Sequence, residues 1–460
     1  MKNDVDMRNG SLYTGILQFA IPVILTTLLQ NMFHTADLIV VGQFCGSISV
    51  AAVTSTTSIT ALIVSLFTGI SLGTGLTVAR ALGGQQEEDV SRCVHTALPT
   101  ALIGGCFLSI FGVIFSPALL KMMNTPEDVL PLSSIYMRLY FAGIIFTIVY
   151  NFCAAILRAV GDTKTPLYSL LFSGTANIVM NLFFVILCKM DVAGVALATS
   201  ISQAISALLV LIALTQRTDS CQLQLKKIRI YKQQLLSIFR IGLPAGLQSS
   251  LFSISNVLIT SSINSFHSAA IISANGTVQN IEAFISPIDI GFHQAAPNFI
   301  AQNLGAHRFD RIKKTYWITL AYDFLFMLAA SIIIYTFGEP LMSLYITDSP
   351  EAIKMGYIRL AYVTLPYCLV CTMNVTNGAL RGLGYSLTAM ILSLAGACVL
   401  RIIWIFTIFQ IPEYHTLACL YQSYPVTWIV TFIIELTVFF RIYKKLLTKN
   451  QSLNDAGGTV

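Results

Sequence analysis

Long runs without a charged side chain constrain the fold of this chain more than any other feature. No Asp, Glu, Lys or Arg occurs in residues 38–79, and comparable gaps cover residues 9–36, 192–216 and 241–281. A helix needs about 20 mostly apolar residues to cross a bilayer, so each run can hold at least one span. Charged residues make up only 10% of the sequence, against roughly 25% in soluble proteins, which excludes an ordinary soluble fold.

Charges, glycines and prolines divide these apolar runs into twelve expected membrane helices. The sequence therefore predicts an all-α integral membrane protein. The expected spans cover residues 12–40, 50–79, 93–116, 133–157, 165–188, 193–215, 235–262, 273–301, 316–338, 355–380, 386–410 and 416–440.

Lys and Arg lie mostly on one side of these spans. Of the 27 basic residues, 21 fall at the termini or in loops that the spans place on the same side as the termini. Basic residues accumulate in cytoplasmic loops, so we expect a multi-pass protein of the plasma (inner) membrane with both termini cytoplasmic. Topology then explains the net charge of +6, with the lipid bilayer as partner and no nucleic acid.

The second half of the chain repeats the first with a shift of about 223 residues. Pro22 falls on Pro244, and AILRAVG at 155–161 falls on GALRGLG at 378–384. The repeat predicts two six-helix bundles related by a pseudo-two-fold axis along the membrane normal, an architecture typical of transporters. The expected parts are an N-terminal bundle (1–215), a basic cytoplasmic linker (216–232), a C-terminal bundle (233–445) and a cytoplasmic tail (446–460).

A duplicated bundle is also compatible with a channel or an enzyme scaffold. The segment Gly69-Ile70-Ser71-Leu72-Gly73 matches G-x-S-x-G, but that nucleophile motif follows a strand, and this segment lies within a span. Small residues that let helices pack closely explain it better. The sequence has no ATP-binding P-loop and no H-E-x-x-H metalloprotease motif. We therefore expect neither an enzyme nor a cofactor.

Several segments, taken together, resemble one transporter family. They are PVILTTLLQNMFHTADLIVVG from Pro22, GISLGTGLTVARALGG from Gly69, ILRAVGDTKTP from Ile156, GLPAGLQSS from Gly242 and FIAQNLGA from Phe299. In this order and spacing the chain resembles the multidrug and toxic compound extrusion family, MATE, and its DinF-like branch. The resemblance implies rocker-switch efflux of small organic compounds in exchange for Na⁺ or H⁺, through a V-shaped pair of lobes.

Ionisable residues inside the bilayer are costly and therefore candidates for function. Asp37 lies near the outer end of the first span, and Asn177 and Asn181 share a face of the fifth. Thr199 and Gln203 share a face of the sixth, at a depth that lets these oxygens meet. A hard cation such as Na⁺ prefers oxygen ligands, and the carboxylate could bind a proton instead. Structural hydrogen bonding of Asp37 to the amides is the alternative.

The family resemblance assigns roles to four of these positions. It implies that the acid fifteen residues after the first-helix proline, here Asp37 after Pro22, couples transport to the ion. Bending of the helix at Pro22 is also implied. The family site is completed by Asn177 and Thr199, but Asn181 stands where archaeal members carry a second acid. With one formal charge instead of two, the site should bind Na⁺ more weakly.

The remaining candidates are less specific. His34 lies one turn before Asp37 and could tune it, although a neutral histidine near the headgroups is the simpler interpretation. Glu282 and Asp289 could face a substrate cavity with Gln203 and His34, and Glu282 could instead pair with Arg401 at similar depth. Asp323 and Glu435 are expected to reach towards basic residues at cytoplasmic helix ends.

The repeat provides an internal comparison. Shifting Asp37, Asn177 and Asn181 into the second half gives Ile259, Leu400 and Trp404, so the second bundle has no copy of the site. We therefore predict a monomeric antiporter that exports amphipathic organic cations in exchange for Na⁺ or H⁺. A lipid or lipid-linked saccharide flippase is the alternative and should present more cationic residues to its cavity. A membrane-embedded enzyme is the remote one.

Overall fold

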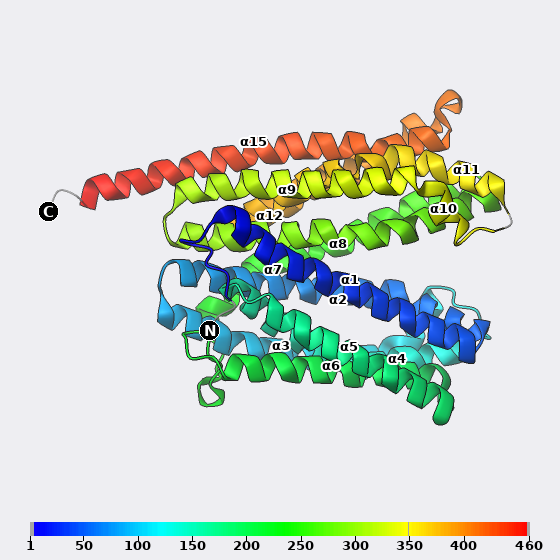
Figure 1. Ribbon diagram of the computed structural model, residues 1–460, viewed down its shortest axis with the longest axis horizontal. Coiled ribbons are helices and arrows are strands. Elements are labelled where there is room, and N and C mark those ends of the chain that lie inside the picture. The colour runs from blue at the N-terminus through cyan, green and yellow to red at the C-terminus, as the bar shows by residue number, and fades with distance from the viewer. Residues whose placement is uncertain (1–3, 348, 458–460) are drawn as a thin grey trace. The chain divides into compact units, whose positions relative to one another are not determined.

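The computed structural model describes residues 4–347 and 349–457, with side chains described up to residue 452, and these residues contain helices but no strand (Figure 1). The first half contains α1 (Leu12–Phe44), α2 (Ser47–Gly83), α3 (Glu87–Met122), α4 (Leu130–Val160), α5 (Lys164–Leu182) with a π-helical end (Phe183–Leu187), α6 (Asp191–Thr215) and a 3₁₀ turn (Leu225–Lys227). The second half contains α7 (Lys232–Asn264), α8 (Ala269–Gly305), α9 (Phe309–Thr336), α10 (Gly338–Ser343), α11 (Pro350–Arg359), α12 (Cys368–Gly382), α13 (Ser386–Ser393), α14 (Leu400–Phe406) and α15 (Leu417–Gly457). Irregular helical turns at Leu360–Thr364, Leu365–Tyr367, Leu394–Val399, Ile408–Gln410 and Pro412–Tyr414 connect or flank α11 to α15.

The twelve predicted spans are confirmed as helical segments. Among the described residues, eleven segments are long and apolar enough to cross a membrane, by length and composition. The twelfth, α8, has 37 residues but carries Glu282 and Asp289 among its amide and hydroxyl side chains. Most helices extend beyond the predicted ends, because charged residues that mark the edge of an apolar run still continue the helix; α9, for example, begins at Phe309.

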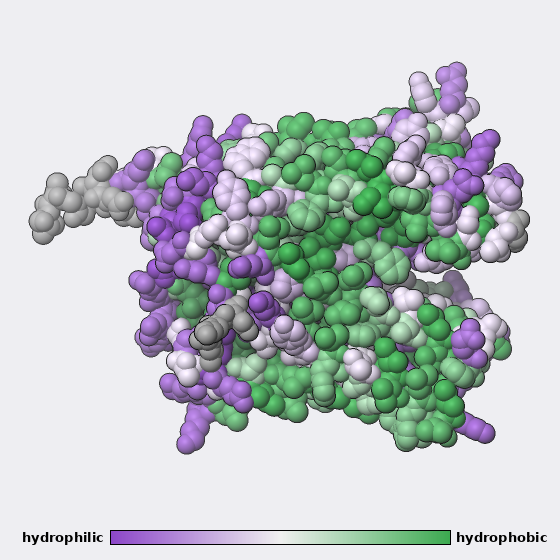
Figure 2. Space-filling model, viewed as in Figure 1, coloured by the Kyte–Doolittle hydropathy of each residue, from purple (hydrophilic) through white to green (hydrophobic). Residues whose placement is uncertain are grey.

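Apolar side chains cover the middle of the helices, and hydrophilic ones gather towards their ends (Figure 2). Exposed large residues such as Ile103, Phe107 and Ile110 on α3 are typical of the apolar band. In a soluble protein so large an apolar surface would cause aggregation. In this chain it is the surface that meets lipid, which agrees with an all-α integral membrane fold.

The chain forms two compact units. Unit 1 contains Pro22–Ser249 and the residues before Met7, whereas unit 2 contains Met7–Ile21 and the chain from Ser250 onwards. Helix α1 therefore begins in unit 2 and ends in unit 1, and α7 begins in unit 1 and ends in unit 2. The division falls within these two helices and not in the basic segment 216–232.

Each of these half-helices is anchored in its unit by specific contacts. In unit 2, the Asn303 side chain donates to the Met7 carbonyl at 3.1 Å, and the Phe19 and Phe299 rings meet edge-on with centroids 5.9 Å apart. In unit 1, a Cβ on Gly69 would lie 2.1 Å from the Gly246 nitrogen. The first parts of α1 and α7 are thus packed elements of the units that hold them.

Glycines bring α2 and α7 into backbone contact in unit 1. A Cβ on Gly73 would lie 2.6 Å from the nitrogen of Gly242, one turn from the Gly69 and Gly246 contact. Two glycine pairs spaced by four residues on each helix form a small-residue interface of the kind that packs membrane helices. The prediction that the G-x-S-x-G segment serves helix packing is confirmed. The Ser71 hydroxyl bonds to the Thr68 carbonyl of its own helix at 2.7 Å.

The sequence repeat is also visible in the backbone. Gly161, directly after α4, and Gly384, two residues after α12, are 223 residues apart and have φ of +101° and +91°. Gln85 and His307, which are 222 residues apart, adopt φ of +55° and +56° in the turns after α2 and α8. A left-handed backbone is uncommon outside glycine, so its recurrence at equivalent turns indicates one duplicated design.

The basic segment after α6 is docked on unit 1. Arg217 is buried and pairs with Asp4 at 2.7 Å and Asp219 at 2.5 Å. The backbone N–H of Gln224 donates to the His95 ring of α3 at 3.0 Å. The predicted linker at 216–232 is therefore held against the helices in this structure. The predicted tail at 446–460 is helical as far as Gly457, and its last three residues lie outside the described part.

Candidate ion and substrate site

The four side chains predicted to hold an ion converge in unit 1. Asn181 donates its side-chain N–H groups to Asp37 Oδ1 at 2.5 Å and to Asn177 Oδ1 at 3.2 Å. The Thr199 hydroxyl donates to Asp37 Oδ2 at 3.4 Å. Helix periodicity explains this geometry, because Asn177 and Asn181 lie one turn apart on α5 and face the same part of α1.

The carboxylate of Asp37 is buried but has only neutral partners. Asp37 is 8% exposed, and the described residues form no ion pair with it. The side-chain oxygen of Asn181 has no hydrogen-bond partner among the described residues and is fully buried. Asp37 therefore has no counter-ion among the described residues, and the Asn181 amide that donates to it keeps a buried oxygen without a hydrogen-bond partner.

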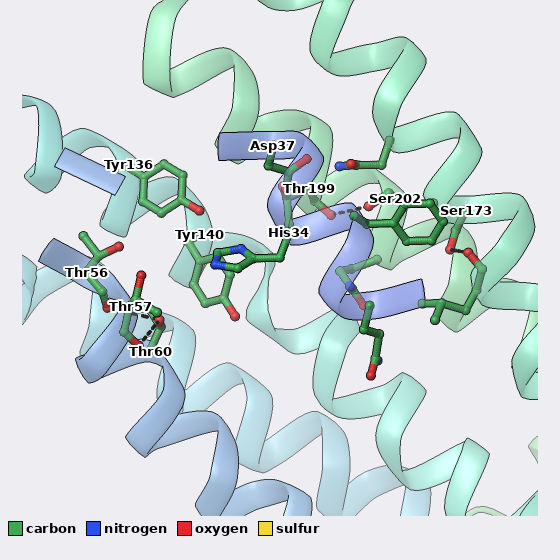
Figure 3. A pocket seen from close by; sticks show the side chains of 16 residues that line it. His34, Asp37, Thr56, Thr57, Thr60, Tyr136, Tyr140, Ser173, Thr199 and Ser202 are labelled. Carbon is green, nitrogen blue, oxygen red and sulfur yellow. Dashed lines mark hydrogen bonds between the residues drawn. The ribbon is translucent and has the colours of Figure 1, made fainter. Parts of the chain in front are cut away.

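A pocket of about 240 Å³ opens beside Asp37 (Figure 3). His34 and Gln203, both predicted as substrate-cavity residues, also line it. Among the lining side chains in the described chain there is one carboxylate and no Lys or Arg. The pocket can thus accept a positive charge without first displacing a basic side chain.

A glycine lets α1 approach α5 at this pocket. A Cβ on Gly174 would lie only 1.9 Å from the ring of Phe33, which is one turn before Asp37 on α1. Both residues line the pocket. The close approach sets the spacing between the two helices that supply Asp37, Asn177 and Asn181.

Further pocket residues were not predicted from the sequence. They are six hydroxyl side chains on α2, α4, α5 and α6, and their common feature is a polar group inside an apolar span. They are Thr56, Thr57, Thr60, Tyr136, Ser173 and Ser202. The signal that could have identified the α2 members is the run Thr54-Ser55-Thr56-Thr57-Ser58, which is unusually rich in hydroxyls for a membrane helix.

Helix α1 runs without interruption through Pro22. The Thr26 hydroxyl bonds to the Pro22 carbonyl at 2.7 Å, as serine and threonine often do near proline in membrane helices. A bend at Pro22 during transport therefore stays a prediction.

Comparison with known proteins identifies the family. The sequence model described as MatE matches residues 22–183 and, a second time, residues 244–407. The chain belongs to the MATE family. The two matches start 222 residues apart and end 224 apart, which agrees with the internal repeat. The DinF-like branch stays a prediction.

The curated relatives match this protein over most of its length. It is 27% identical to the "Probable multidrug resistance protein YoeA" of Bacillus subtilis over 95% of both chains. It is 22% identical to the "Multidrug export protein MepA" of Staphylococcus aureus over 82% of this chain and 81% of the relative. A solved "Outward-facing conformation of a multidrug resistance MATE family transporter" superposes with a TM-score of 0.89 at 22% identity, covering 97% of this chain and 99% of that one. The MATE chain is therefore a membrane transporter and not an enzyme.

The acids in unit 2 of the MATE chain have different surroundings. Glu282 is 7% exposed and pairs with Arg359 at 2.6 Å. The Thr364 hydroxyl also donates to Glu282 at 2.7 Å, and a second Arg359 nitrogen donates to Asn275 at 2.7 Å. The prediction that Glu282 pairs with Arg401 is wrong, because equal depth does not place two residues on facing sides of their helices. The contacts favour a structural role for Glu282.

Arg401 faces α15 instead. Its guanidinium lies 4.1 Å from the centre of the Tyr424 ring and donates to the Thr427 hydroxyl at 3.2 Å. A cation over an aromatic ring is stabilised by the ring's negative face, which explains how this arginine is accommodated at 3% exposure.

Asp289, Asp323 and Glu435 are embedded in unit 2. Asp289 accepts a hydrogen bond from Asn374 at 2.7 Å. The expected reach of Asp323 and Glu435 towards cytoplasmic basic residues is wrong, since both are fully buried. Asp323 lies in the middle of α9, and Glu435 accepts from Ser393 at 2.6 Å and from Asn377 at 3.2 Å.

The positions equivalent to the unit 1 site are apolar. Ile259, at the place of Asp37, is buried in a hydrophobic cluster, and Trp404, at the place of Asn181, packs against the same cluster. Leu400 is the residue at the position equivalent to Asn177. The constellation around Asp37 is therefore confined to one of the two repeats.

Proposed function

We propose that this MATE protein is a secondary antiporter that exports amphipathic organic cations in exchange for Na⁺ or H⁺. The observation that carries the proposal is the buried Asp37 carboxylate, which lies in a pocket and has only amide and hydroxyl partners. A carboxylate without a counter-ion in a membrane protein is costly unless it binds something positive. Proton uptake or Na⁺ binding would each remove that cost.

The coupling ion would be held by Asp37, Asn177, Asn181 and Thr199. Sodium accepts oxygen ligands, and this group offers one carboxylate with amide and hydroxyl oxygens. The free oxygen of Asn181 supports a cation ligand beyond the carboxylate. A proton would need Asp37 alone. In either case the ion drives export only if ion and drug differ in affinity for the two access states.

A cationic substrate agrees with the lining of the pocket. The nearby rings of Phe33, Tyr136 and Tyr140 can contact a planar cation, and His34 and Gln203 add polar contacts. A flippase for lipid-linked pyrophosphates would need basic residues to hold its substrate, and the described lining has none. The relatives named above carry multidrug names, which favours drug export.

We further propose that the protein acts as a monomer in the plasma membrane with both termini cytoplasmic. The asymmetric distribution of Lys and Arg supports this orientation. Accessibility of single cysteines introduced at the exposed Asp128 and at Lys226 to an impermeant thiol reagent, in intact cells of a variant lacking reactive native cysteines, tests it. Labelling at residue 226 but not at residue 128 would reverse the topology.

The central experiment is efflux of a fluorescent organic cation from proteoliposomes, driven separately by an imposed Na⁺ gradient and by a proton gradient. Efflux by the wild type should respond to one gradient. In Asp37→Asn the efflux rate driven by that gradient should fall at least about tenfold, and a tenfold change corresponds to about 1.4 kcal/mol. Asp128→Asn, which removes an exposed acid elsewhere in unit 1, is the matched control.

Each result has a distinct meaning. Efflux that responds to one gradient and is lost in Asp37→Asn identifies both antiport and the ion. Equal gradient-driven efflux in the variant would remove Asp37 from the mechanism. The absence of cation transport under either gradient, with lipid scrambling in the same vesicles, would make the flippase the better interpretation.

A further inference from the structure

Unit 2 contains a mixed cluster of ligand-type side chains that the proposed antiport does not use. Asp289 of α8, Asp323 of α9 and Cys371 of α12 each place one ligand atom so that all three atoms lie within 4.8 Å of one another. Three different helices supply them, so the cluster is a product of tertiary packing. Asp323 and Cys371 are fully buried, and Asp289 is partly exposed.

The carboxylates in this cluster lack compensation. Neither oxygen of Asp323 has a hydrogen-bond partner among the described residues, and Asp289 Oδ1 lacks one too. The described ion pairs include neither acid. Two adjacent carboxylates without a basic partner, one of them fully buried, repel each other, so the pair takes up either a proton or a metal cation. Three oxygens thus remain available for a ligand.

Hydrogen bonds outside the cluster hold Asp289 in place. The Asn374 amide donates to Asp289 Oδ2 at 2.7 Å, which leaves Oδ1 free. The His293 ring, one turn further along α8, donates to the Asn374 carbonyl at 2.7 Å. Orientation of a ligating carboxylate by an outer hydrogen bond is typical of built metal sites.

The donor set indicates which cation fits. Binding of a metal by Cys371 releases the thiol proton to solvent. Two carboxylates and one thiolate then carry three negative charges, of which one divalent ion neutralises two. Mg²⁺ and Ca²⁺ require six or more oxygen ligands, whereas sulfur favours zinc-like ions. Bonds of about 2.0–2.3 Å to a tetrahedral zinc place ligand atoms roughly 3.3–3.8 Å apart, so small rotamer changes would complete the geometry. The fourth position would open on the partly exposed side of Asp289.

We propose that Asp289, Asp323 and Cys371 form a binding site for one divalent transition-metal ion of the Zn²⁺ or Cd²⁺ class. The bound ion links α8, α9 and α12 and so stabilises unit 2. The site is separate from the antiport proposed above, and its test needs no transport measurement.

The test uses purified full-length protein in detergent, freed of metal by a chelator and titrated with Cd²⁺. We expect one tight site per chain, seen as near-ultraviolet thiolate-to-cadmium absorption, competition by Zn²⁺ and a higher unfolding temperature. Changing an outer-shell partner typically costs about 10–100-fold in metal affinity. Asp323→Asn and Cys371→Ser each remove a proposed direct ligand, so each should weaken Cd²⁺ binding by at least as much, about tenfold or more.

Two control variants distinguish this site from other thiols. Cys419→Ser removes a buried cysteine of unit 2 outside the cluster and should leave Cd²⁺ affinity unchanged. Cys368→Ser, one turn from Cys371 on α12, should also leave it unchanged. If Asp323→Asn does not fold, the partly exposed Asp289→Asn serves in its place, with unfolding of the metal-free protein as the check.

Three outcomes would overturn the proposal. The first is wild-type protein that shows no saturable Cd²⁺ or Zn²⁺ binding, which would leave a shared proton as the compensating charge. The second is binding that is lost in Cys368→Ser but kept in Asp323→Asn, which would assign the metal to the thiol pair. The third is equal saturation by Mg²⁺, which would exclude the sulfur ligand.

Discussion

The two units of this transporter come from one repeat but treat their buried acids differently. In unit 1, Asp37 has neutral partners and lies beside a pocket. In unit 2, Glu282 is neutralised by Arg359, and the position equivalent to Asp37 is Ile259, buried among apolar side chains. Duplication preserved the helical frame in both units, whereas unit 2 has a buried apolar residue at the position where unit 1 has Asp37.

This difference separates two uses of a charge in a membrane helix. A paired acid is satisfied in every state and contributes mainly to the fold, because breaking the pair exposes a buried charge. An acid with neutral partners gains most by binding an exchangeable cation. Substitutions in the two units should therefore fail differently, through stability in unit 2 and through ion coupling in unit 1.

The largest effect is expected for Arg359→Gln. It leaves Glu282 buried without its counter-ion and should lower the free energy of unfolding by about 3–5 kcal/mol. The double variant Glu282→Gln/Arg359→Gln should recover part of this loss. Denaturant unfolding of the purified protein measures both. Unchanged stability combined with lost efflux would show that Glu282 acts in transport, and the comparison between the units would fail.

Gly174→Ala tests the helix approach that shapes the unit 1 pocket. The added Cβ would meet the Phe33 ring at 1.9 Å, and overpacking of this kind typically costs about 1–3 kcal/mol. We expect ion-driven efflux in proteoliposomes to fall by roughly tenfold. Gly276→Ala on α8 is the matched control, because its Cβ meets no atom within 4 Å. Equal efflux in both variants would contradict the assigned role of Gly174.

Asn181→Asp would add a second carboxylate next to Asp37. If Na⁺ is the coupling ion, the added charge should lower the half-saturating Na⁺ concentration by at least about tenfold, since a nearby opposite charge in a partly buried site contributes more than 1 kcal/mol. Initial efflux rates against Na⁺ concentration measure this. Asn124→Asp adds the same charge on an exposed turn and should change nothing. An unaltered Na⁺ dependence in Asn181→Asp would argue against these oxygens as Na⁺ ligands.

The smallest effect is expected for Thr199→Val. The bond from its hydroxyl to Asp37 is long at 3.4 Å, and a typical hydrogen bond contributes about 0.5–1.5 kcal/mol. Ion-driven efflux should fall by no more than about threefold. Thr54→Val on α2, whose hydroxyl bonds only to its own helix, controls for the loss of a hydroxyl. A loss as large as that of Asp37→Asn would make Thr199 a principal ion ligand.

The sequence was sufficient to predict the helices, the repeat and the residues around Asp37. Apolar length determines a span, and a four-residue spacing determines which side chains share a helix face, so Asn177 and Asn181 could be grouped without coordinates. The α2 pocket hydroxyls of Thr56, Thr57 and Thr60 were missed because serine and threonine are common in membrane helices, where they bond to their own backbone, as these three do.

The failures in unit 2 have a geometric cause. Counting residues from a helix end gives depth but not the direction in which a side chain points. Arg401 was therefore named as the partner in one of the two alternatives for Glu282, whereas Arg359 lies opposite it. Depth itself was misjudged for Asp323, because α9 begins at Phe309 and places this acid mid-helix. The spacing of charged residues gives neither the rotation of a helix about its own axis nor the residue at which the helix begins.

The sharing of α1 and α7 between the units limits how the protein can be divided. Residues 7–21 belong to unit 2 and the first part of α7 belongs to unit 1, so a chain cut in the segment 216–232 would leave each fragment without a piece of its own core. In an ancestor with one copy of the repeat, the same arrangement would mean that two subunits exchanged the first part of their first helix.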